Sequence, residues 1–337
     1  MAISNELLST TLYSIRDKEV DELFRKVAFL ENCKTYNGIE YENGGIKIQR
    51  PLALAEHSVI TQLTTGYEPV SLAVQDVLQP AIYNWCDFTA PIVISEKEEL
   101  ENSGEKAIVK IVEVRMRSVM GMLKRELNKQ ILLGTSTILT EMNTLNGDKA
   151  GGFLEPTAAG TQVNTVGGID KGVVSAIGWQ NQLADAGGDF SLNGIRVMQQ
   201  AQIEADSIAP MGTMDAVILS NACMANYRSA LEVNVRYINA EQLNAGKMNL
   251  AFGDATVQSD SVIDYTTTRL AIGAKLSGYM INFEAIKMVF HSKGDFAVRP
   301  FEYIPGTATR SSRLYVKCQL IADHLGSCAV IINGETF

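Results

Sequence analysis

The most regular pattern in the chain is a helical repeat of apolar residues in its first half. Apolar side chains recur there every three or four positions, the period of a helix with one buried face. The members of this repeat are Ile108, Val112, Met116, Val119, Leu123, Leu127 and Ile131. The pattern predicts a spine helix within residues 96–134, uninterrupted from 105 to 133 and roughly 45 Å long.

The predicted start of this helix is acidic and its end is a glycine. Glu96, Glu98, Glu99 and Glu101 precede an Asn-Ser-Gly sequence, and Gly134 follows the last apolar position. Carboxylates are favourable at a helix N-terminus, where they interact with unpaired amides, and glycine commonly ends a helix.

Before the spine helix the pattern changes from helical to extended. Residues 1–35 have the spacing of one or two short helices, and residues 36–95 alternate in the manner of strands. Residues 39–41 and 46–48 flank an Asn-Gly-Gly turn, which predicts a hairpin. A second strand pair is predicted around residues 59–66, with a short helix at 72–78 and an apolar run at 82–94. This region therefore reads as a projecting β loop that has no core of its own.

After the spine helix and a glycine-rich linker, helical and strand-like segments alternate. Helices are predicted at 169–183, 192–208 and 221–231, and strands at 216–219 and 250–257. From residue 277 onward the chain is mostly β-branched and aromatic runs parted by Gly, Asp and Pro, which predicts strands. These late strands need an earlier partner, so we expect them to complete a sheet on the spine helix around an inserted α/β domain. The fold class is therefore α+β.

Charge and composition narrow the possible functions. The chain has 337 residues, 46% of them apolar, and a net charge of -9, which argues against tight electrostatic binding of nucleic acid. It has neither a signal-peptide pattern nor an apolar run long enough to span a membrane, so a cytoplasmic location is expected. The five scattered cysteines are expected to be buried free thiols.

No credible active site is found in the sequence, so no catalytic, cofactor or metal site is predicted. The three histidines are dispersed, and no nucleotide-binding or nucleophile motif occurs. The glycines of the Thr-Val-Gly-Gly-Ile-Asp sequence at 165–170 are compatible with an anion site at a helix start, but a turn into a helix is favoured. Lys287, Lys293 and Asp295 near Asn282 are interpreted as a charged turn. Trp85 and Trp179 are interpreted as core or interface anchors.

The order of these parts resembles a known family. Local similarities include Trp85 with the Pro-Ile-Val-Ile sequence at 91–94, and Glu101, Asn102 and Gly104 before the spine helix. Further similarities are the Gly-Thr-Ser sequence at 134–136 and the segments 165–182, 293–303 and 319–325. The chain resembles the major capsid proteins of tailed bacteriophages, which have the Hong Kong 97-type capsid fold.

The resemblance implies a division of the chain and a structural role. Residues 1–35 would be an N-terminal arm, 36–95 the extended β loop, 96–164 with 277–337 the peripheral domain, and 165–276 the axial domain. The chain would assemble in hexamers and pentamers into an icosahedral shell around double-stranded DNA, which it would contact weakly. Expected partners are a separate scaffolding protein, a portal and a decoration protein, with no membrane. The location would be the virion, assembled in the cytoplasm of a bacterial host. Lys and Asn residues of the kind that cross-link some members are not matched.

The expected contacts between subunits follow from this reading. The candidates are Glu96, Glu98, Glu99, Glu101, Asn43, Gly44, Trp85 and Trp179, with the glutamates facing Arg or Lys of a neighbour. Deleting residues 38–65 is expected to leave the subunit folded and to block assembly. Two alternatives stay open: an encapsulin-like bacterial nanocompartment shell, and a cytosolic α/β enzyme with its site in residues 165–231.

Overall fold

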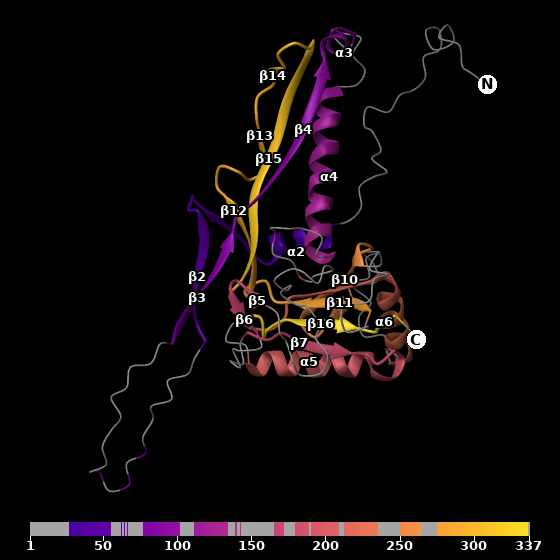
Figure 1. The fold of residues 1–337 in the computed structure, drawn as a ribbon. Coiled ribbons are helices and arrows are strands. Elements are labelled where there is room, and N and C mark those ends of the chain that lie inside the picture. Colours follow the sequence, from indigo (N-terminus) through magenta and orange to yellow (C-terminus); the bar gives the residue numbers. More distant parts are fainter. Residues whose placement is uncertain are drawn as a thin grey trace, which may run out of the picture.

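The computed structural model describes most of the chain in separate stretches. These are residues 27–54, 62, 64, 66, 77–101, 111–133, 139, 142, 165–171, 179–188, 190–208, 212–234, 250–263 and 275–335. The predictions for residues 1–26, the second strand pair and most of the linker after the spine helix lie outside these residues. Figure 1 shows an elongated upper part beside helix α4, a compact lower part with two further helices, and a projecting two-stranded ribbon.

The upper part is built on one six-stranded sheet. Its longest strand is β15 (Thr309–Ala322), which pairs antiparallel with β4 (Cys86–Ser95) over ten consecutive residue pairs. β15 also pairs with β12 (Ile286–His291), β13 (Ala297–Val298) and β14 (Glu302–Tyr303), and β1 (Ile39–Glu42) pairs parallel with β12. One long strand therefore ties together four others: β12, β13 and β14, which directly precede it in sequence, and β4, which lies more than two hundred residues earlier.

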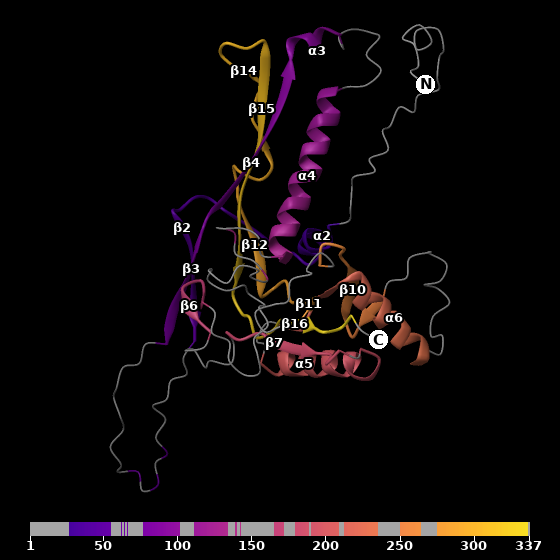
Figure 2. The same cartoon turned by 45° about the vertical axis from the view of Figure 1, so that its right-hand side comes forward.

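Helix α4 (Ile111–Leu133) lies along β4, as both views show (Figures 1 and 2). The predicted apolar stripe is confirmed where side chains are described, since Leu123, Leu127 and Ile131 are all buried. The acidic segment is helical at Glu96–Glu101 (α3), directly after β4, and the predicted residues between 101 and 111 lie outside the described residues. The spine helix is thus confirmed over residues 111–133.

The lower part contains a second six-stranded sheet. Its order is β7 (Gln182–Asp185), β16 (Ala329–Ile332), β11 (Leu276–Ile281), β8 (Ala216–Leu219), β10 (Ala255–Ser259) and β9 (Leu250–Phe252). Val217 and Leu219 of β8 pack with residues of α5 (Ile195–Ile208) and α6 (Asn221–Asn234). Ala216 and Ile218, on the other face, join the cluster that contains α2 and α4. A central strand covered on both faces is apolar at every position, as β8 is.

The second sheet crosses the predicted domain boundary at residues 276 and 277. The sequence predicts β11 and β16 in the sheet on the spine helix, but both lie in the second sheet, where β11 pairs with β8 and β16 pairs with β11 and β7. Both strands are buried at every position, so they need a central place with cover on both faces. Strand-like composition does not say which of two sheets a strand joins.

The hairpin predicted around Gly44 is wrong. β1 pairs with β12, and β2 (Lys47–Ala53) pairs antiparallel with β3 (Leu78–Asn84). Gly44 and Gly45 do have the positive φ values expected of a turn, at 104° and 94°, but the turn leads from the sheet into the ribbon. The ribbon, defined here as β2 and β3, projects from the body in Figure 1. Of the helix predicted at 72–78 only the last two residues are described, and Leu78 begins β3.

The helix predicted at 169–183 is also wrong at both ends. β5 (Thr165–Val166) and β6 (Ile169–Asp170) form a tight hairpin, and β7 begins at Gln182. Gly167 and Gly168 form its turn with φ values of 58° and 82°. Two successive residues with positive φ are typical of a two-residue hairpin turn. The glycine pair therefore turns one strand into another, and no helix begins at this turn to hold an anion.

Helix α2 (Ala28–Thr35) belongs to the core, although it falls in the predicted N-terminal arm. Ala28, Phe29 and Cys33 are fully buried, and the Phe29 ring lies 5.7 Å from that of Phe283. α2 contacts both α4 and β8, so it joins the upper and lower parts. Among the described helices none is long and apolar enough to cross a membrane.

Candidate functional site

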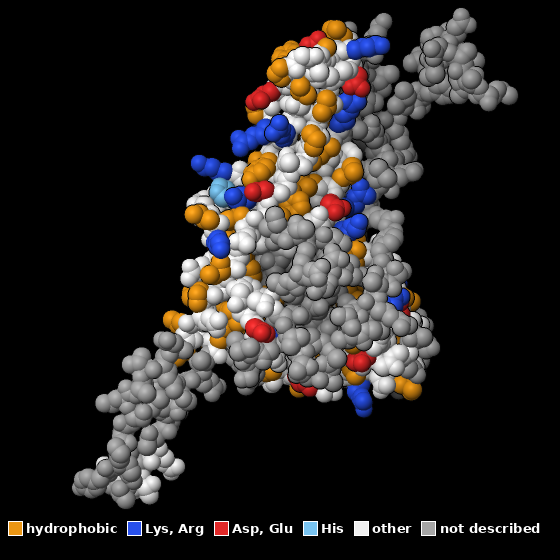
Figure 3. Space-filling model, in the orientation of Figure 1, with side chains coloured by type: hydrophobic (Ala, Val, Ile, Leu, Met, Phe, Trp, Pro, Cys, Tyr) orange, Lys and Arg blue, Asp and Glu red, His pale blue; other side chains and the backbone are white. Residues whose placement is uncertain are grey.

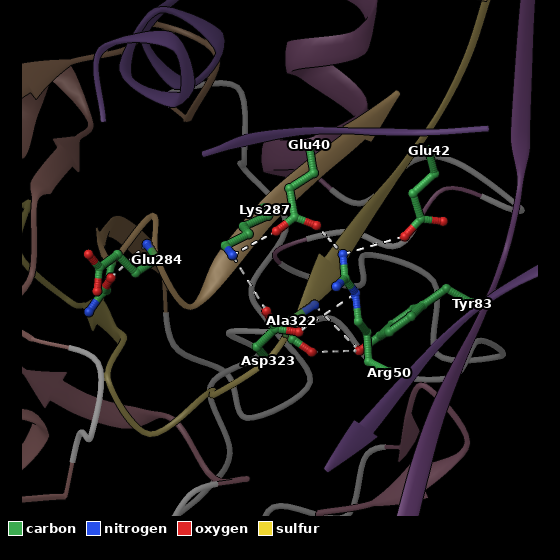
Figure 4. A network of polar contacts seen from close by, with 9 residues as sticks. Glu40, Glu42, Arg50, Tyr83, Glu284, Lys287, Ala322 and Asp323 are labelled. Carbon is green, nitrogen blue, oxygen red and sulfur yellow. Dashed lines mark hydrogen bonds and ion pairs between the residues drawn. The ribbon is translucent and has the colours of Figure 1, made fainter. Parts of the chain in front are cut away.

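A network of charged side chains surrounds the base of the ribbon (Figure 4). Arg50 of β2 pairs with Glu40 of β1, and its guanidinium lies 3.5 Å from Glu42 and 4.0 Å from Asp323. Lys287 of β12 donates to Glu40 at 2.7 Å and lies 3.9 Å from Asp323. These five side chains are between 16% and 34% exposed. The network thus links the ribbon to β1 and β12 of the first sheet and to Asp323, the residue that follows β15.

The pKa values of two carboxylates in the network, Asp323 and Glu40, shift in opposite directions. Burial raises the pKa of Asp323, and the charges of Arg50 and Lys287 oppose that rise without cancelling it. Burial also acts to raise the pKa of Glu40, but the hydrogen bond from Lys287 and the charges of Arg50 and Lys287 outweigh it, so the pKa falls. The cations of the network therefore outweigh burial at Glu40 but not at Asp323.

The ribbon is also held on its inner face. Tyr83 of β3 is buried and donates from its hydroxyl to the carbonyl of Ala322 at 3.2 Å. The amide of Ile82 donates to the carbonyl of Gly167 at 2.9 Å, which joins β3 to the β5–β6 hairpin. With the charged network, these contacts fix the direction in which the ribbon leaves the body.

The opposite face of the ribbon exposes apolar side chains. Ile48, Leu52, Ala81 and Tyr83 alternate along the buried face. Leu78 and Ile82 on the other side of β3 are 69% and 44% exposed, and Ile46 just before β2 is 91% exposed. Figure 3 shows hydrophobic side chains over this part of the surface. Grouped exposed apolar side chains mark surfaces that bind another molecule.

Helix α3 is fixed to the body by one of its glutamates. Ser95 and Glu98 form a reciprocal capping box: the Glu98 amide donates to Ser95 Oγ at 3.2 Å, and the Ser95 amide donates to Glu98 Oε2 at 3.3 Å. Arg115 of α4 donates to both carboxylate oxygens of Glu98, at 2.8 and 2.9 Å. This bidentate hydrogen bonding, followed by the bond from Ser95, lowers the pKa of Glu98 to about 2. Glu98 therefore pairs within its own chain.

The other predicted contact residues lie in different places. Glu96 is half-exposed without an ion-pair partner in the described part of the chain, and the side chains of Glu99 and Glu101 lie outside the described residues. Trp179 is fully buried, which favours its reading as a core anchor. A contact of Glu96, Glu99 or Glu101 with a neighbouring subunit stays a prediction.

Asn43, Gly44 and Trp85 come together at the turn that leads into the ribbon. Trp85 Nε1 donates to the carbonyl of Gly45 at 3.1 Å, and Ser292 Oγ donates to Asn43 Oδ1. The Trp85 ring is 9% exposed and meets the His291 ring edge-on, with 5.9 Å between centroids. Trp85 therefore anchors this turn from within the chain.

Of the residues interpreted as a charged turn, Lys287 lies instead in the paired strand β12, and Lys287, Asp295 and the neighbouring Asn282 have partners within the chain. Lys287 belongs to the network at the ribbon base, which the sequence pattern did not reveal because its partners lie at residues 40 and 323. Asp295 accepts a hydrogen bond from the Tyr41 hydroxyl at 2.9 Å. The Asn282 amide donates to the Gly212 carbonyl at 3.1 Å and accepts from the Glu284 amide at 2.8 Å. Each contact joins segments that are apart in sequence or caps a turn, and none places a nucleophile beside a base.

The thiols and metal-binding side chains give no reactive centre. All five cysteines are free and buried, as predicted, and burial raises the pKa of the Cys223 and Cys328 thiols to about 12. A thiol with such a pKa is a poor nucleophile at neutral pH. Among the described residues no three His, Cys, Asp or Glu side chains are grouped so that they could hold a metal ion.

Comparison with known proteins gives a match in structure alone. No family model matches the sequence, and no curated protein matches it. The capsid asymmetric unit of cyanophage A-1(L) has a TM-score of 0.63 at 12% identity, with 99% of both chains covered. The capsid of the Myoviridae phage XM1 has a TM-score of 0.60 at 12% identity, with 98% of this chain and 99% of that chain covered. The holo-SrpI encapsulin complex from Synechococcus elongatus has a TM-score of 0.57 at 10% identity, with 99% and 96% covered. The capsid fold expected from the sequence is therefore confirmed.

Proposed function

We propose that this chain is a shell subunit, the major capsid protein of a tailed bacteriophage, which assembles into an icosahedral shell around double-stranded DNA. The observation that carries the proposal is the ribbon: it projects from the folded body and exposes Leu78 and Ile82, with Ile46 exposed just before it. The fold, which the chain shares over nearly its whole length with phage capsid proteins, supports the same role.

The physical argument is that the ribbon buries its outer face on another copy. A two-stranded ribbon is marginally stable by itself, and within the described part of the chain only its inner face is buried. A neighbouring subunit would supply the missing cover. Contacts between different surfaces of identical copies form rings when the rotation closes, and rings of five and six copies can tile a shell.

The remaining partners belong to the same proposal. A separate scaffolding protein would direct assembly, a portal would occupy one vertex, and a decoration protein could add to the outer surface. The net charge of -9 suits a container whose wall does not hold its DNA tightly. The chain would function in the virion after assembly in the cytoplasm of a bacterial host, with a structural and not a catalytic role.

The second candidate is an encapsulin-like shell that encloses protein cargo. The match to the Synechococcus elongatus encapsulin complex favours it, because its TM-score is close to those of the phage capsids. Particles purified from the native source distinguish the two, since a capsid yields nuclease-protected DNA and an encapsulin yields an enclosed protein.

The test of assembly is a deletion at the tip of the ribbon. Deleting residues 38–65, as the sequence suggested, would remove β1 from the first sheet and so would damage the fold. The sharper variant replaces residues 55–76 with a two-residue turn, because the Leu54 amide already donates to the Val77 carbonyl at 3.2 Å.

The full chain, expressed with scaffold where required, is expected to form closed shells in electron micrographs. The tip-deleted chain is expected to keep the thermal midpoint of the intact subunit and to form no shells. The capsid proposal is wrong if the full chain stays a monomer or dimer under every assembly condition. If the tip-deleted chain assembles normally, residues 55–76 are not needed for assembly. The assigned role of the ribbon is wrong if a variant with Leu78→Ser and Ile82→Ser, which changes its exposed face, also assembles normally.

A further inference from the structure

Two arginines face each other across neighbouring strands on the exposed side of the first sheet. The register of β13 with β15 places Ala297 opposite Tyr315 and Val298 opposite Leu314, and the next amide, that of Arg299, donates to the Arg313 carbonyl at 2.9 Å. Arg299 and Arg313 are thus cross-strand neighbours, and both are exposed. We call this pair the arginine patch.

The arginine patch has no neutralising partner within the described part of the chain. Neither arginine takes part in an ion pair. The nearby carboxylates are used elsewhere: Asp87 accepts from the Tyr315 hydroxyl at 2.7 Å and lies 3.9 Å from Lys317, and Asp295 accepts from Tyr41. Glu302 of β14, opposite Ser311, also lies beside β15 but forms no ion pair with either arginine among the described residues.

Such an arrangement costs stability in an isolated subunit. Like charges directly opposite on adjacent strands repel each other, and no acid among the described residues pairs with either arginine to offset that repulsion. Figure 3 shows further Lys and Arg side chains along the same edge of the molecule, although the chain as a whole is acidic. The patch is therefore suited to a carboxylate or phosphate supplied from outside, for which arginine is the preferred partner.

The acidic helix α3 supplies the complementary charge at the same end of the molecule. Its six residues contain four glutamates and one lysine, and Glu96 is half-exposed without an ion-pair partner in the described residues. Arg313 lies opposite Pro91, five residues before Glu96, a distance of about 16 Å along a strand. The two surfaces are therefore too far apart to pair within one copy.

We propose that α3 of one copy binds the arginine patch of a neighbouring copy. This inference rests on the proposed shell function and names a contact within it. Acid and base lie apart on the same end of the subunit. In the proposed contact the acid of each copy meets the base of the next, a heterologous contact that can close into a ring. Exposed apolar side chains beside the patch, Val93 at 47% and Phe301 at 36%, add surface to bury.

The test is a charge exchange in the full-length chain. One variant carries Arg299→Glu and Arg313→Glu, a second carries Glu96→Lys, Glu99→Lys and Glu101→Lys, and a third combines them. Glu98 is kept because it pairs with Arg115. The conservative control carries Arg299→Lys and Arg313→Lys. Each reversal is expected to lower the yield of shells by about tenfold or more, because like charges then meet across the contact. The combined variant and the lysine control are expected to form shells at close to the unmodified yield.

The outcomes separate this inference from the proposed function. Circular dichroism melting first shows that each variant subunit is folded. The inference is overturned if the arginine reversal assembles normally, if the combined variant does not recover, or if the lysine control fails as well. If the unmodified chain forms no shells, the proposed function fails. Sedimentation still tests the contact in that case: oligomers of the unmodified chain should be absent from the arginine reversal and present again in the combined variant. An unmodified chain that does not associate at all overturns both.

Discussion

At the scale of single residues, Arg50 connects the ribbon to three carboxylates of the body. It is the cation of β2 that pairs with Glu40 and lies near Glu42 and Asp323. Removing one partner of a partly buried pair leaves the opposite charges desolvated without compensation. The contacts of Arg50 cannot be read from the sequence, because its partners lie up to 273 positions away (323 minus 50).

We expect Arg50→Ala to lower the free energy of unfolding by about 1–2 kcal/mol, toward the low end for a buried pair because these side chains retain solvent contact. Urea unfolding of the unassembled subunit measures it. Arg228→Ala, at an exposed position of α6, is the matched control and should change stability by less than about 0.5 kcal/mol. Equal effects of the two substitutions would show that the network contributes nothing.

Glu98 gives a prediction for pH dependence. Its pKa in the folded subunit, about 2, lies below the ordinary value of 4.5, so the folded chain binds this proton less tightly than the unfolded chain. The stabilisation it provides is therefore complete above pH 4.5 and is lost as the pH falls toward 2. The stability difference between the unmodified chain and Glu98→Gln should be constant from pH 5 to 7 and shrink below pH 4.5. A difference that persists unchanged at pH 2 would contradict the assignment.

At the scale of elements, the β5–β6 hairpin is the piece that supports the ribbon from the side. Gly167 and Gly168 both need positive φ, but only Gly167 touches the ribbon. A Cβ on Gly167 would lie 2.9 Å from Cβ of Ala81 and 3.1 Å from the Tyr83 ring, whereas one on Gly168 would meet nothing within 4 Å. An alanine at 168 therefore tests backbone strain alone, and an alanine at 167 tests backbone strain together with packing against β3.

Gly168→Ala is expected to cost about 1 kcal/mol from backbone strain alone. Gly167→Ala should cost about 1–3 kcal/mol more, because the added methyl group overpacks the contact with β3. Denaturant midpoints of the two variants provide the comparison. If both lose the same stability, the hairpin does not press on the ribbon.

At the scale of the whole molecule, the upper and lower parts share one hydrophobic cluster. The same contiguous cluster includes Leu127 of α4, Met288 of β12, and Ile218 and Tyr279 of the second sheet. Tyr279 also donates from its hydroxyl to the Leu132 carbonyl at 2.8 Å, which ties β11 to the end of α4. Parts that share a core are expected to unfold together.

We therefore predict a single cooperative unfolding transition for the unassembled subunit. Trp85 reports on the first sheet and Trp179 lies just before β7 of the second sheet, so Trp85→Phe and Trp179→Phe each leave one local probe. Within each variant, tryptophan fluorescence and far-ultraviolet circular dichroism should give the same midpoint. Separate midpoints would show that the two parts unfold independently.

The sequence by itself determined the local structure where periodicity was strong. The buried stripe of α4, the strand Ala216–Leu219, the helices α5 and α6, and the free buried cysteines all follow from composition and spacing. The order of these parts also indicated the capsid fold. These features depend on neighbours within a few turns of the chain, which the sequence contains directly.

Only the tertiary structure decided which strands pair and what the polar residues contact. β1 pairs with β12 and not with β2, β11 and β16 join the second sheet, and Glu98 finds Arg115 in its own chain. The sequence left Trp179 as a core or interface anchor, and the structure shows it fully buried. No sequence pattern indicated that Arg299 and Arg313, which were not among the candidates, stand together on an exposed face. A strand carries the same alternating or apolar pattern whichever partner it joins, and an ion pair depends on two positions that only the folded chain brings together.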